Sequence, residues 1–121
     1  MQTILIVENA AVQRELLVHW LQDDYTVFTA ADGAAGIALA EWTNPDLIFM
    51  ALALPGIDGA EATRRIKARA RRRDIPIIAL TSQVLMGEDA IVRAAGCADT
   101  LRTPLEEERV TATLQKWLGG G

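Results

Sequence analysis

Residues 45–59 read Pro-Asp-Leu-Ile-Phe-Met-Ala-Leu-Ala-Leu-Pro-Gly-Ile-Asp-Gly and decide the fold. An uninterrupted apolar run spans residues 47–54, which predicts a strand buried on both faces, as in a parallel sheet. A Pro-Gly pair and an Asp-Gly pair then predict a loop, and a helical pattern follows. In an open α/β sheet, ligands bind in loops at the carboxyl ends of strands. The residue at the tip of this predicted strand is Ala51.

The same alternation of apolar runs and helical patterns extends along the chain. The predicted strands span residues 3–7, 25–30, 47–50, 75–80 and 100–102, and the predicted helices span about 11–23, 33–42, 59–72, 87–95 and 105–118. Asn44-Pro45 should end the second helix and Gly96 the fourth. Five successive β-α units predict an α/β fold, a doubly wound parallel sheet with helices on both faces and strand order 2-1-3-4-5.

Length and composition are those of one globular domain. The chain has 121 residues, of which 50% are apolar and 23% charged. We expect the domain to cover residues 1–118, with a flexible glycine tail at 119–121. The net charge of −4 argues against nucleic-acid binding. No basic segment precedes the first strand, and no apolar run approaches the roughly 20 residues that cross a bilayer. We therefore expect a cytoplasmic protein without membrane contact.

Short motifs along nearly the whole chain resemble those of a known protein family. They are Ile-Leu-Ile-Val at 4–7, Ala-Ala-Asp-Gly at 30–33, Pro-Asp-Leu-Ile at 45–48, Leu-Pro-Gly-Ile-Asp-Gly at 54–59, Glu-Ala-Thr-Arg-Arg-Ile at 61–66, Ile-Pro-Ile-Ile-Ala-Leu-Thr at 75–81, Ala-Ala-Gly-Cys at 94–97 and Thr-Pro-Leu at 103–105. In order and spacing they resemble the receiver domain of two-component signalling, as found in chemotaxis response regulators and in hybrid histidine kinases. The resemblance implies a CheY-like, flavodoxin-like fold.

The resemblance also implies where the family's phosphorylation chemistry would lie. In receivers an acidic pair after the first strand helps to bind Mg²⁺, and here that pair is Glu8 and Asn9. The aspartate that accepts the phosphoryl group falls on Ala51. The hydroxyl residue that ends the fourth strand falls on Thr81, and the lysine that ends the fifth falls on Thr103.

These substitutions predict a pseudo-receiver. The methyl group of Ala51 cannot form an acyl phosphate. With Asn9 in place of an acid, Mg²⁺ binding should be weak or absent, and we expect no cofactor and no enzymatic activity. The acids and the lysine are lost together, which leaves no orphan buried charge. That pattern favours a natural pseudo-receiver over an engineered variant, in which Asn9 and Thr103 would have remained acid and lysine.

A receiver without phosphorylation would act through binding. The resemblance places its interaction face at Val84, Leu85, Thr100 and Arg102, with Thr100 at the position of the family's aromatic switch residue. The implied partner is a histidine kinase or another signalling domain, and a homodimer is possible; neither nucleic acid nor membrane is expected. The peptide bond before Pro104 is commonly cis in receivers, so we expect it to be cis here.

Two other functions are weighed against this one. A phosphorelay receiver could take the phosphoryl group on a displaced residue such as Thr81, Ser82 or Asp58, although none of them ends the third strand. A flavin enzyme of the same fold would need a loop rich in hydroxyl groups and glycine after the first strand. Residues 8–12 read Glu-Asn-Ala-Ala-Val, which excludes that function.

Several residues have a structural interpretation as well as a functional one. We expect Glu8 to be a solvated loop acid rather than half of a metal site, and Thr81 to cap a loop. Seven of the twelve basic residues lie at positions 64–73, typical of a solvated helix face, with an anionic partner as the alternative. The other expectations are an apolar helix face of Val12, Leu16, Leu17, Trp20 and Leu21, packing of Trp117, partial exposure of Trp42, a surface His19 and a buried Cys97.

Overall fold

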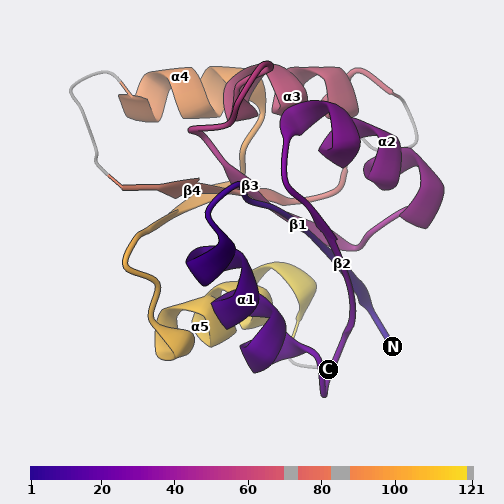
Figure 1. The fold of residues 1–121 in the computed structure, drawn as a ribbon, viewed down its shortest axis with the longest axis vertical. Coiled ribbons are helices and arrows are strands. Elements are labelled where there is room, and N and C mark those ends of the chain that lie inside the picture. Colours follow the sequence, from indigo (N-terminus) through magenta and orange to yellow (C-terminus); the bar gives the residue numbers. More distant parts are fainter. Residues whose placement is uncertain (70–73, 83–87, 120–121) are drawn as a thin grey trace.

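The computed structural model describes residues 1–69, 74–82 and 88–119. Strands and helices alternate along them in five β-α units (Figure 1). The elements are β1 Thr3–Val7, α1 Ala11–Leu21, β2 Thr26–Ala30, α2 Gly33–Thr43, β3 Leu47–Ala51, α3 Gly59–Lys67, β4 Ile77–Thr81, α4 Glu88–Ala95, β5 Asp99–Arg102 and α5 Glu107–Leu118. Every element predicted from the sequence is present, with small shifts at the ends.

The five strands form one parallel sheet in the order β2-β1-β3-β4-β5. This is the predicted doubly wound order. Strand β3 lies at the centre, and all five of its residues are buried, which explains its unbroken apolar sequence. The direction of winding reverses between β1 and β3, so their carboxyl ends form the edge at which an α/β fold places its site.

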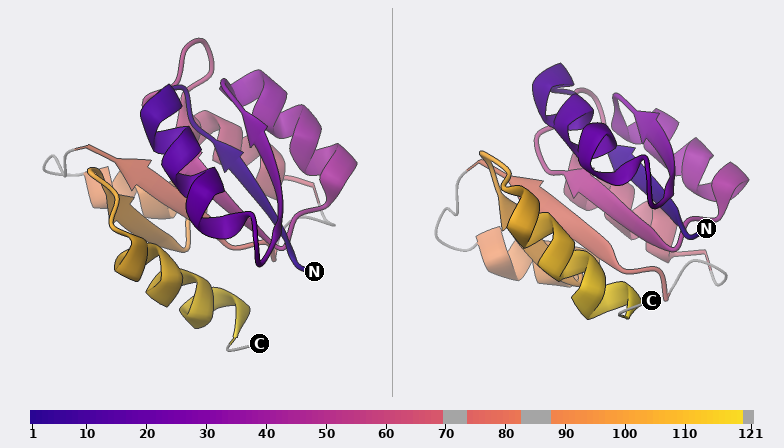
Figure 2. Two further views of the ribbon diagram at one scale, coloured as in Figure 1. Left: turned by 60° about the horizontal axis from the view of Figure 1, so that its bottom comes forward. Right: turned by 90° about the horizontal axis from the view of Figure 1, so that it is seen from below.

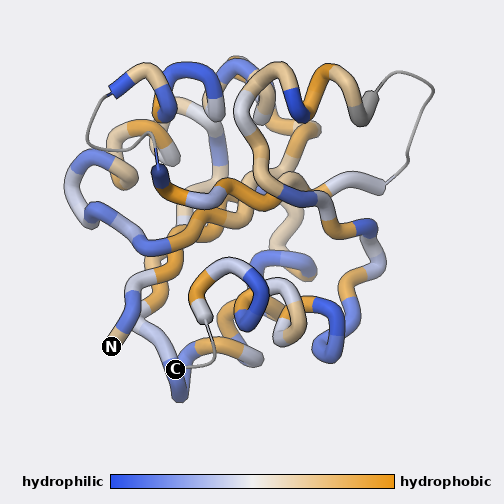
Figure 3. The backbone as a smooth tube through the Cα atoms, turned by 180° about the vertical axis from the view of Figure 1, so that it is seen from behind, coloured by the Kyte–Doolittle hydropathy of each residue, from blue (hydrophilic) through white to orange (hydrophobic). Residues whose placement is uncertain are grey.

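Helices cover both faces of the sheet. Helices α2, α3 and α4 lie on one face, and α1 and α5 lie on the other (Figures 1 and 2). Successive residues of a strand point to opposite faces, so each face has its own core. Leu5 and Met50 belong to the core under α2–α4, whereas Ile4 and Phe49 belong to the core under α1 and α5. Figure 3 shows the strands as the hydrophobic centre between more polar helices.

Helix α3 is shorter than predicted. The sequence predicted a helix over about 59–72, but α3 ends at Lys67 and Ala68 is its C-cap. Arg69 follows in a tight turn, in which its backbone N–H donates to the Ile66 carbonyl at 3.2 Å. Cations four residues apart repel one another, which disfavours continuing the helix through this sequence. Residues 70–73 of that prediction lie outside the described residues.

The last β-α unit also differs at its ends. Thr81, predicted to follow the fourth strand, is the last residue of β4, where it pairs with Arg102 of β5. Helix α5 begins two residues later than predicted. Leu105 is buried in the core instead, so the chain reaches the helix only after this residue. Gly96 closes α4 with a φ of 107°, as expected for a helix-ending glycine.

Side-chain burial confirms most of the packing predictions. Trp20 and Trp117 pack partly buried against the core, and Cys97 is buried. His19 is exposed. Val12 was wrongly assigned to the buried face of α1: it is 69% exposed. The buried residues of this helix are Leu17 and Leu21.

Trp42 is more exposed than predicted, with 86% of its surface accessible. Within the described residues, no helix has the length and apolar character that a membrane crossing requires.

Candidate functional site

A cleft of about 430 Å³ lies at the carboxyl ends of β1, β3 and β4. The described residues that line it are Glu8, Asn9, Ala10, Gln13, Ala51, Leu52, Ala53, Leu80, Thr81, Ser82 and Thr103. The structure therefore brings together all five residues that the sequence placed at the site, namely Glu8, Asn9, Ala51, Thr81 and Thr103. They come from four separate β-α units, and the parallel sheet aligns the ends of their strands.

Ala51 forms the floor of the cleft. It is the last residue of β3 and is 4% exposed. The chain stays in the ladder for one more residue, because the Leu52 N–H donates to the Leu80 carbonyl at 3.0 Å. The loop that follows folds back onto the end of the strand, because the Gly59 N–H donates to the Leu52 carbonyl at 3.0 Å. Asp58 then caps α3 through a 2.8 Å hydrogen bond from the Glu61 N–H to its Oδ1.

Glu8 is buried, which corrects the expectation of a solvated acid. Its side chain follows β1 directly and is 6% exposed. The carboxylate Oε2 accepts a 3.1 Å hydrogen bond from the Ala10 N–H, next to the start of α1. Arg14 Nη1 donates to the backbone carbonyl of Glu8 at 2.8 Å and to that of Asn9 at 3.3 Å. The sheet ladder and these contacts hold Glu8 inward, whereas Asn9 is exposed.

Thr81 and Thr103 form the opposite wall. Thr81 ends β4 and is buried, and its carbonyl accepts a 2.9 Å hydrogen bond from the Thr103 N–H. The peptide bond between Thr103 and Pro104 is cis, as expected. Both side chains offer hydroxyl groups to the cleft and neither carries a charge.

Gln13 lines the cleft but was missed by sequence reasoning. It lies in the first turn of α1, four residues after Asn9, and its Oε1 atom is buried without a hydrogen bond from the described residues. Its position was the available signal, because the first turn of a helix that follows a strand lies next to the carboxyl end of that strand. A glutamine at such a position is equally common on solvated helices, so the residue type gave no reason to select it.

The two described residues of the predicted interaction face, Thr100 and Arg102, are not among the residues that line the cleft. Thr100 and Arg102 belong to β5. Thr100 lines a smaller hollow of about 150 Å³ together with Val92, Arg93, Cys97, Ala98 and Asp99. Arg102 is exposed. Val84 and Leu85 lie outside the described residues, so the structure describes only half of this predicted face.

The charge and donor set of the cleft limit its chemistry. Glu8 supplies the one carboxylate among its described lining residues, and none of them is basic. In the described part of the chain, no group of three or more His, Cys, Asp or Glu side chains could hold a metal ion. Mg²⁺ prefers several hard oxygen ligands in octahedral geometry. One carboxylate already engaged by Ala10, with an exposed amide beside it, does not fit that requirement.

The comparisons with known proteins agree with this geometry. The profile of the response regulator receiver domain matches residues 4–115. This chain belongs to the receiver domain family. Among curated relatives, Protein PilH of Pseudomonas aeruginosa is 31% identical over 121 residues, covering 99% of this chain and 100% of the relative. The polar-differentiation response regulator DivK of Brucella ovis is 29% identical, covering 98% and 97%.

Solved receiver structures have the same fold. Chemotaxis protein CheY4 of Vibrio cholerae matches with a TM-score of 0.92 at 29% identity, covering 97% of this chain and 98% of that one. The receiver domain of sensor histidine kinase PA1611 from Pseudomonas aeruginosa matches with a TM-score of 0.90 at 37% identity, covering 98% of each chain. That structure is described as having a magnesium ion coordinated in its active site cleft. The receiver fold of the present chain is thus found both in free-standing regulators and in sensor kinases.

Proposed function

We propose that this receiver is a phosphorylation-independent binding module of two-component signalling. The observation that carries the proposal is Ala51 at the end of β3, 4% exposed on the floor of the cleft. By resemblance this is the position of the phospho-acceptor aspartate. A methyl group has no lone pair with which to attack phosphorus, so no acyl phosphate forms there.

The surrounding residues support the same proposal. Phosphoryl transfer depends on cations that neutralise the transferring oxygens. The described residues lining the cleft include no lysine or arginine, and Glu8 and Asn9 are a poor ligand set for Mg²⁺. We therefore propose that the domain holds no cofactor, binds Mg²⁺ weakly or not at all, and is not an enzyme.

The proposed partner is a protein of the signalling pathway. Receiver domains interact with histidine kinases in two-component systems. For this chain we propose a histidine kinase or another signalling domain, with Thr100 and Arg102 of β5 in the contact. A homodimer through the same face is the alternative, and sedimentation of the protein over a range of concentrations distinguishes the two.

The test is treatment with a small phosphodonor and Mg²⁺, followed by intact-mass measurement. We expect no mass increase in the wild-type chain. The triple variant N9D/A51D/T103K restores the acids and the lysine of the family's phosphorylation site and is the positive control. Its expected mass increase, reversed at alkaline pH as an acyl phosphate is, shows that the fold and conditions were adequate.

The same experiment addresses phosphorylation of a displaced residue. Thr81 and Ser82 line the cleft, but a hydroxyl nucleophile needs an adjacent base. The one ionisable group among the described lining residues is the Glu8 carboxylate, and it already accepts a hydrogen bond from the Ala10 N–H. Asp58 is engaged as the cap of α3. A stable phosphate mapped to any of these three residues in the wild-type protein would overturn the proposal.

A further inference from the structure

An exposed surface at the ends of α2 and α3 lies apart from the cleft and from β5. It consists of Trp42 at the end of α2, Arg64 and Arg65 of α3, and Arg69 just beyond α3; we call it the arginine–tryptophan surface. Trp42 is 86% exposed, although tryptophan is usually well buried. The three arginine side chains are between 50% and 59% exposed. Tryptophan and arginine are the residue types that most often carry binding energy at protein interfaces.

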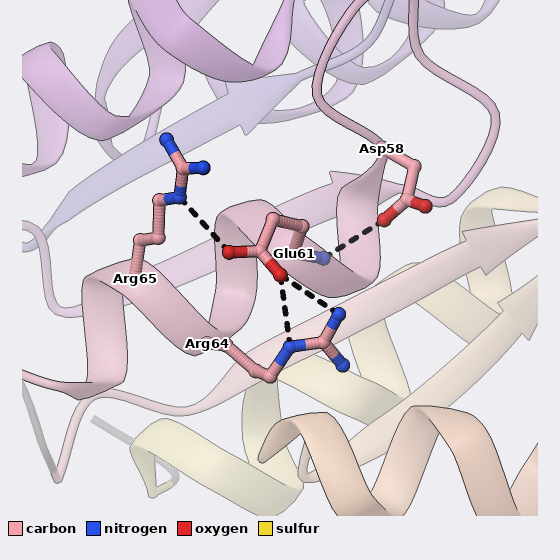
Figure 4. Close-up of polar contacts among 4 residues, drawn as sticks. All are labelled: Asp58, Glu61, Arg64 and Arg65. Carbon is pink, nitrogen blue, oxygen red and sulfur yellow. Dashed lines mark hydrogen bonds and ion pairs between the residues drawn. The ribbon is translucent and has the colours of Figure 1, made fainter.

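Carboxylates hold these guanidinium groups in place. Glu61 lies between two of them in Figure 4, and its Oε1 accepts from Arg64 Nε at 3.1 Å and Arg64 Nη2 at 2.9 Å. Its Oε2 accepts from Arg65 Nε at 2.9 Å. The hydrogen bond from Arg65 lowers the pKa of Glu61 most, and the one from Arg64 lowers it further. The Glu61 carboxylate therefore stays ionised and bound to both arginines in mildly acidic solution. The capping bond from the Glu61 N–H to Asp58 fixes the first turn below it.

A third ion pair joins the two helices. Arg69 Nη1 donates to Glu41 Oε1 at 2.9 Å, linking the turn after α3 to the last residues of α2. Trp42 is the next residue along the chain from Glu41. The ion pair therefore holds Arg69 next to the end of α2, where Trp42 is exposed. In Figure 1 α2 and α3 lie side by side on the face of the sheet opposite α1 and α5.

The bound carboxylates leave part of each guanidinium open. A guanidinium has five N–H donors, and the contacts with Glu61 and Glu41 use two on Arg64, one on Arg65 and one on Arg69. These side chains are at least half exposed, so a partner's carboxylate can reach the other donors of the planar fork. Holding the side chains in advance lowers the entropy lost when a partner binds.

The geometry points to an acidic segment of a partner protein as the ligand of the arginine–tryptophan surface. Its carboxylates would meet Arg64, Arg65 and Arg69, and an apolar side chain would cover Trp42. Charge distribution favours this ligand over nucleic acid. Seven basic residues and no acidic ones lie at positions 64–73, so the rest of the chain carries 16 acidic residues against five basic ones. A long polyanion would meet that excess of negative charge, whereas a short acidic segment would not.

This surface does not depend on the phosphorylation state of the cleft, so its test is separate from the phosphodonor experiment. The probe is a short synthetic peptide that alternates glutamate with leucine, titrated into the ¹⁵N-labelled chain. We expect saturable shifts of the Trp42 indole N–H, assigned with W42F, and of the arginine Nε–H signals. The double variant R65E/R69E should weaken binding at least tenfold, and W42A should weaken it several-fold.

Arg109 provides a matched control. It is also an exposed helical arginine paired with a glutamate three residues away, Glu106, but it lies on α5. R109E should leave peptide affinity unchanged, and all variants should keep the wild-type circular dichroism spectrum. Three results would each overturn the proposal: equal weakening by R109E and R65E/R69E, tighter binding of a single-stranded oligonucleotide of equal charge, or self-association of the chain that R65E/R69E abolishes.

Discussion

Gly59 lies directly against the backbone of Ala51, so that a Cβ atom on Gly59 would collide with the Ala51 carbonyl oxygen. The start of α3 is thereby pressed onto the end of β3. This contact involves the backbone of Ala51 and not its side chain, so it does not depend on which side chain occupies position 51. The scaffold of a receiver site can therefore persist after its reactive side chain has been replaced.

G59A should lower the free energy of unfolding by about 3 kcal/mol, the upper end of the range for overpacking, because backbone must move to admit the methyl group. Urea denaturation provides the measurement. G56A is the control, since a Cβ there meets nothing within 4 Å and the cost is only that of its positive φ of 73°, about 1–2 kcal/mol. Equal losses in the two variants would show that the close approach to Ala51 is unimportant.

A51D should destabilise the protein at neutral pH by roughly 3 kcal/mol, because it adds a second buried carboxylate to the cleft of Glu8 without a cation. The like charge raises the pKa of the new carboxyl in the folded state. The penalty is therefore present at neutral pH and is relieved as the pH falls through that raised value. A51N has the same shape without the charge. If A51N and A51D were equally unstable at neutral pH, charge would not be the cause.

W117F removes a hydrogen bond that joins α5 to β5, in which Trp117 Nε1 donates to Asp99 Oδ2 at 3.0 Å. We expect a loss of about 2 kcal/mol, typical of a hydrogen bond to a charged group. K116A removes a longer, exposed contact of 3.4 Å to the same oxygen and should cost below about 0.5 kcal/mol. The opposite ranking of the two variants would contradict this assignment.

The W117F effect should also depend on pH. Burial opposes ionisation of Asp99, but hydrogen bonds from Trp117, Thr100 and Lys116 together hold the pKa of its carboxyl below the ordinary value. A depressed folded-state pKa contributes stability above the unfolded value of about 4, and that contribution is lost as the pH falls through the folded value. The difference between wild type and W117F should shrink over that acidic range. A difference independent of pH would exclude a role for the Asp99 charge.

Cys97 should react slowly with iodoacetamide in the native protein. It is 8% exposed, and burial raises the pKa of its thiol, more than the hydrogen bond with Thr63 and the charge of Lys67 lower it. Both effects suppress the reactive thiolate. In denaturant the rate should rise to that of a free thiol. An A34C/C97S variant, with its thiol at an exposed position of α2, should react at the fast rate in both conditions.

The amino-acid sequence was sufficient for the elements and their order. Local signals in the sequence identify each element: the apolar run of β3, the glycine and proline residues at turns, and the helical spacing of apolar residues. Five successive β-α units are compatible with few sheet arrangements in which every strand is buried. The cleft residues Glu8, Asn9, Ala51, Thr81 and Thr103 could be named in advance because they end strands of a parallel sheet, and such ends converge on one edge.

The tertiary structure alone decided what depends on residues far apart in the chain. Glu8 is buried because the sheet and α1 enclose it, although an acid after a strand is usually solvated. Trp42 is exposed because α2 packs through its other side, and Glu41 meets Arg69 across 28 positions. Periodicity reports which face of an element is apolar. It does not report which neighbour that face meets, and it is this neighbour that sets burial, charge pairing and the surface left for a partner.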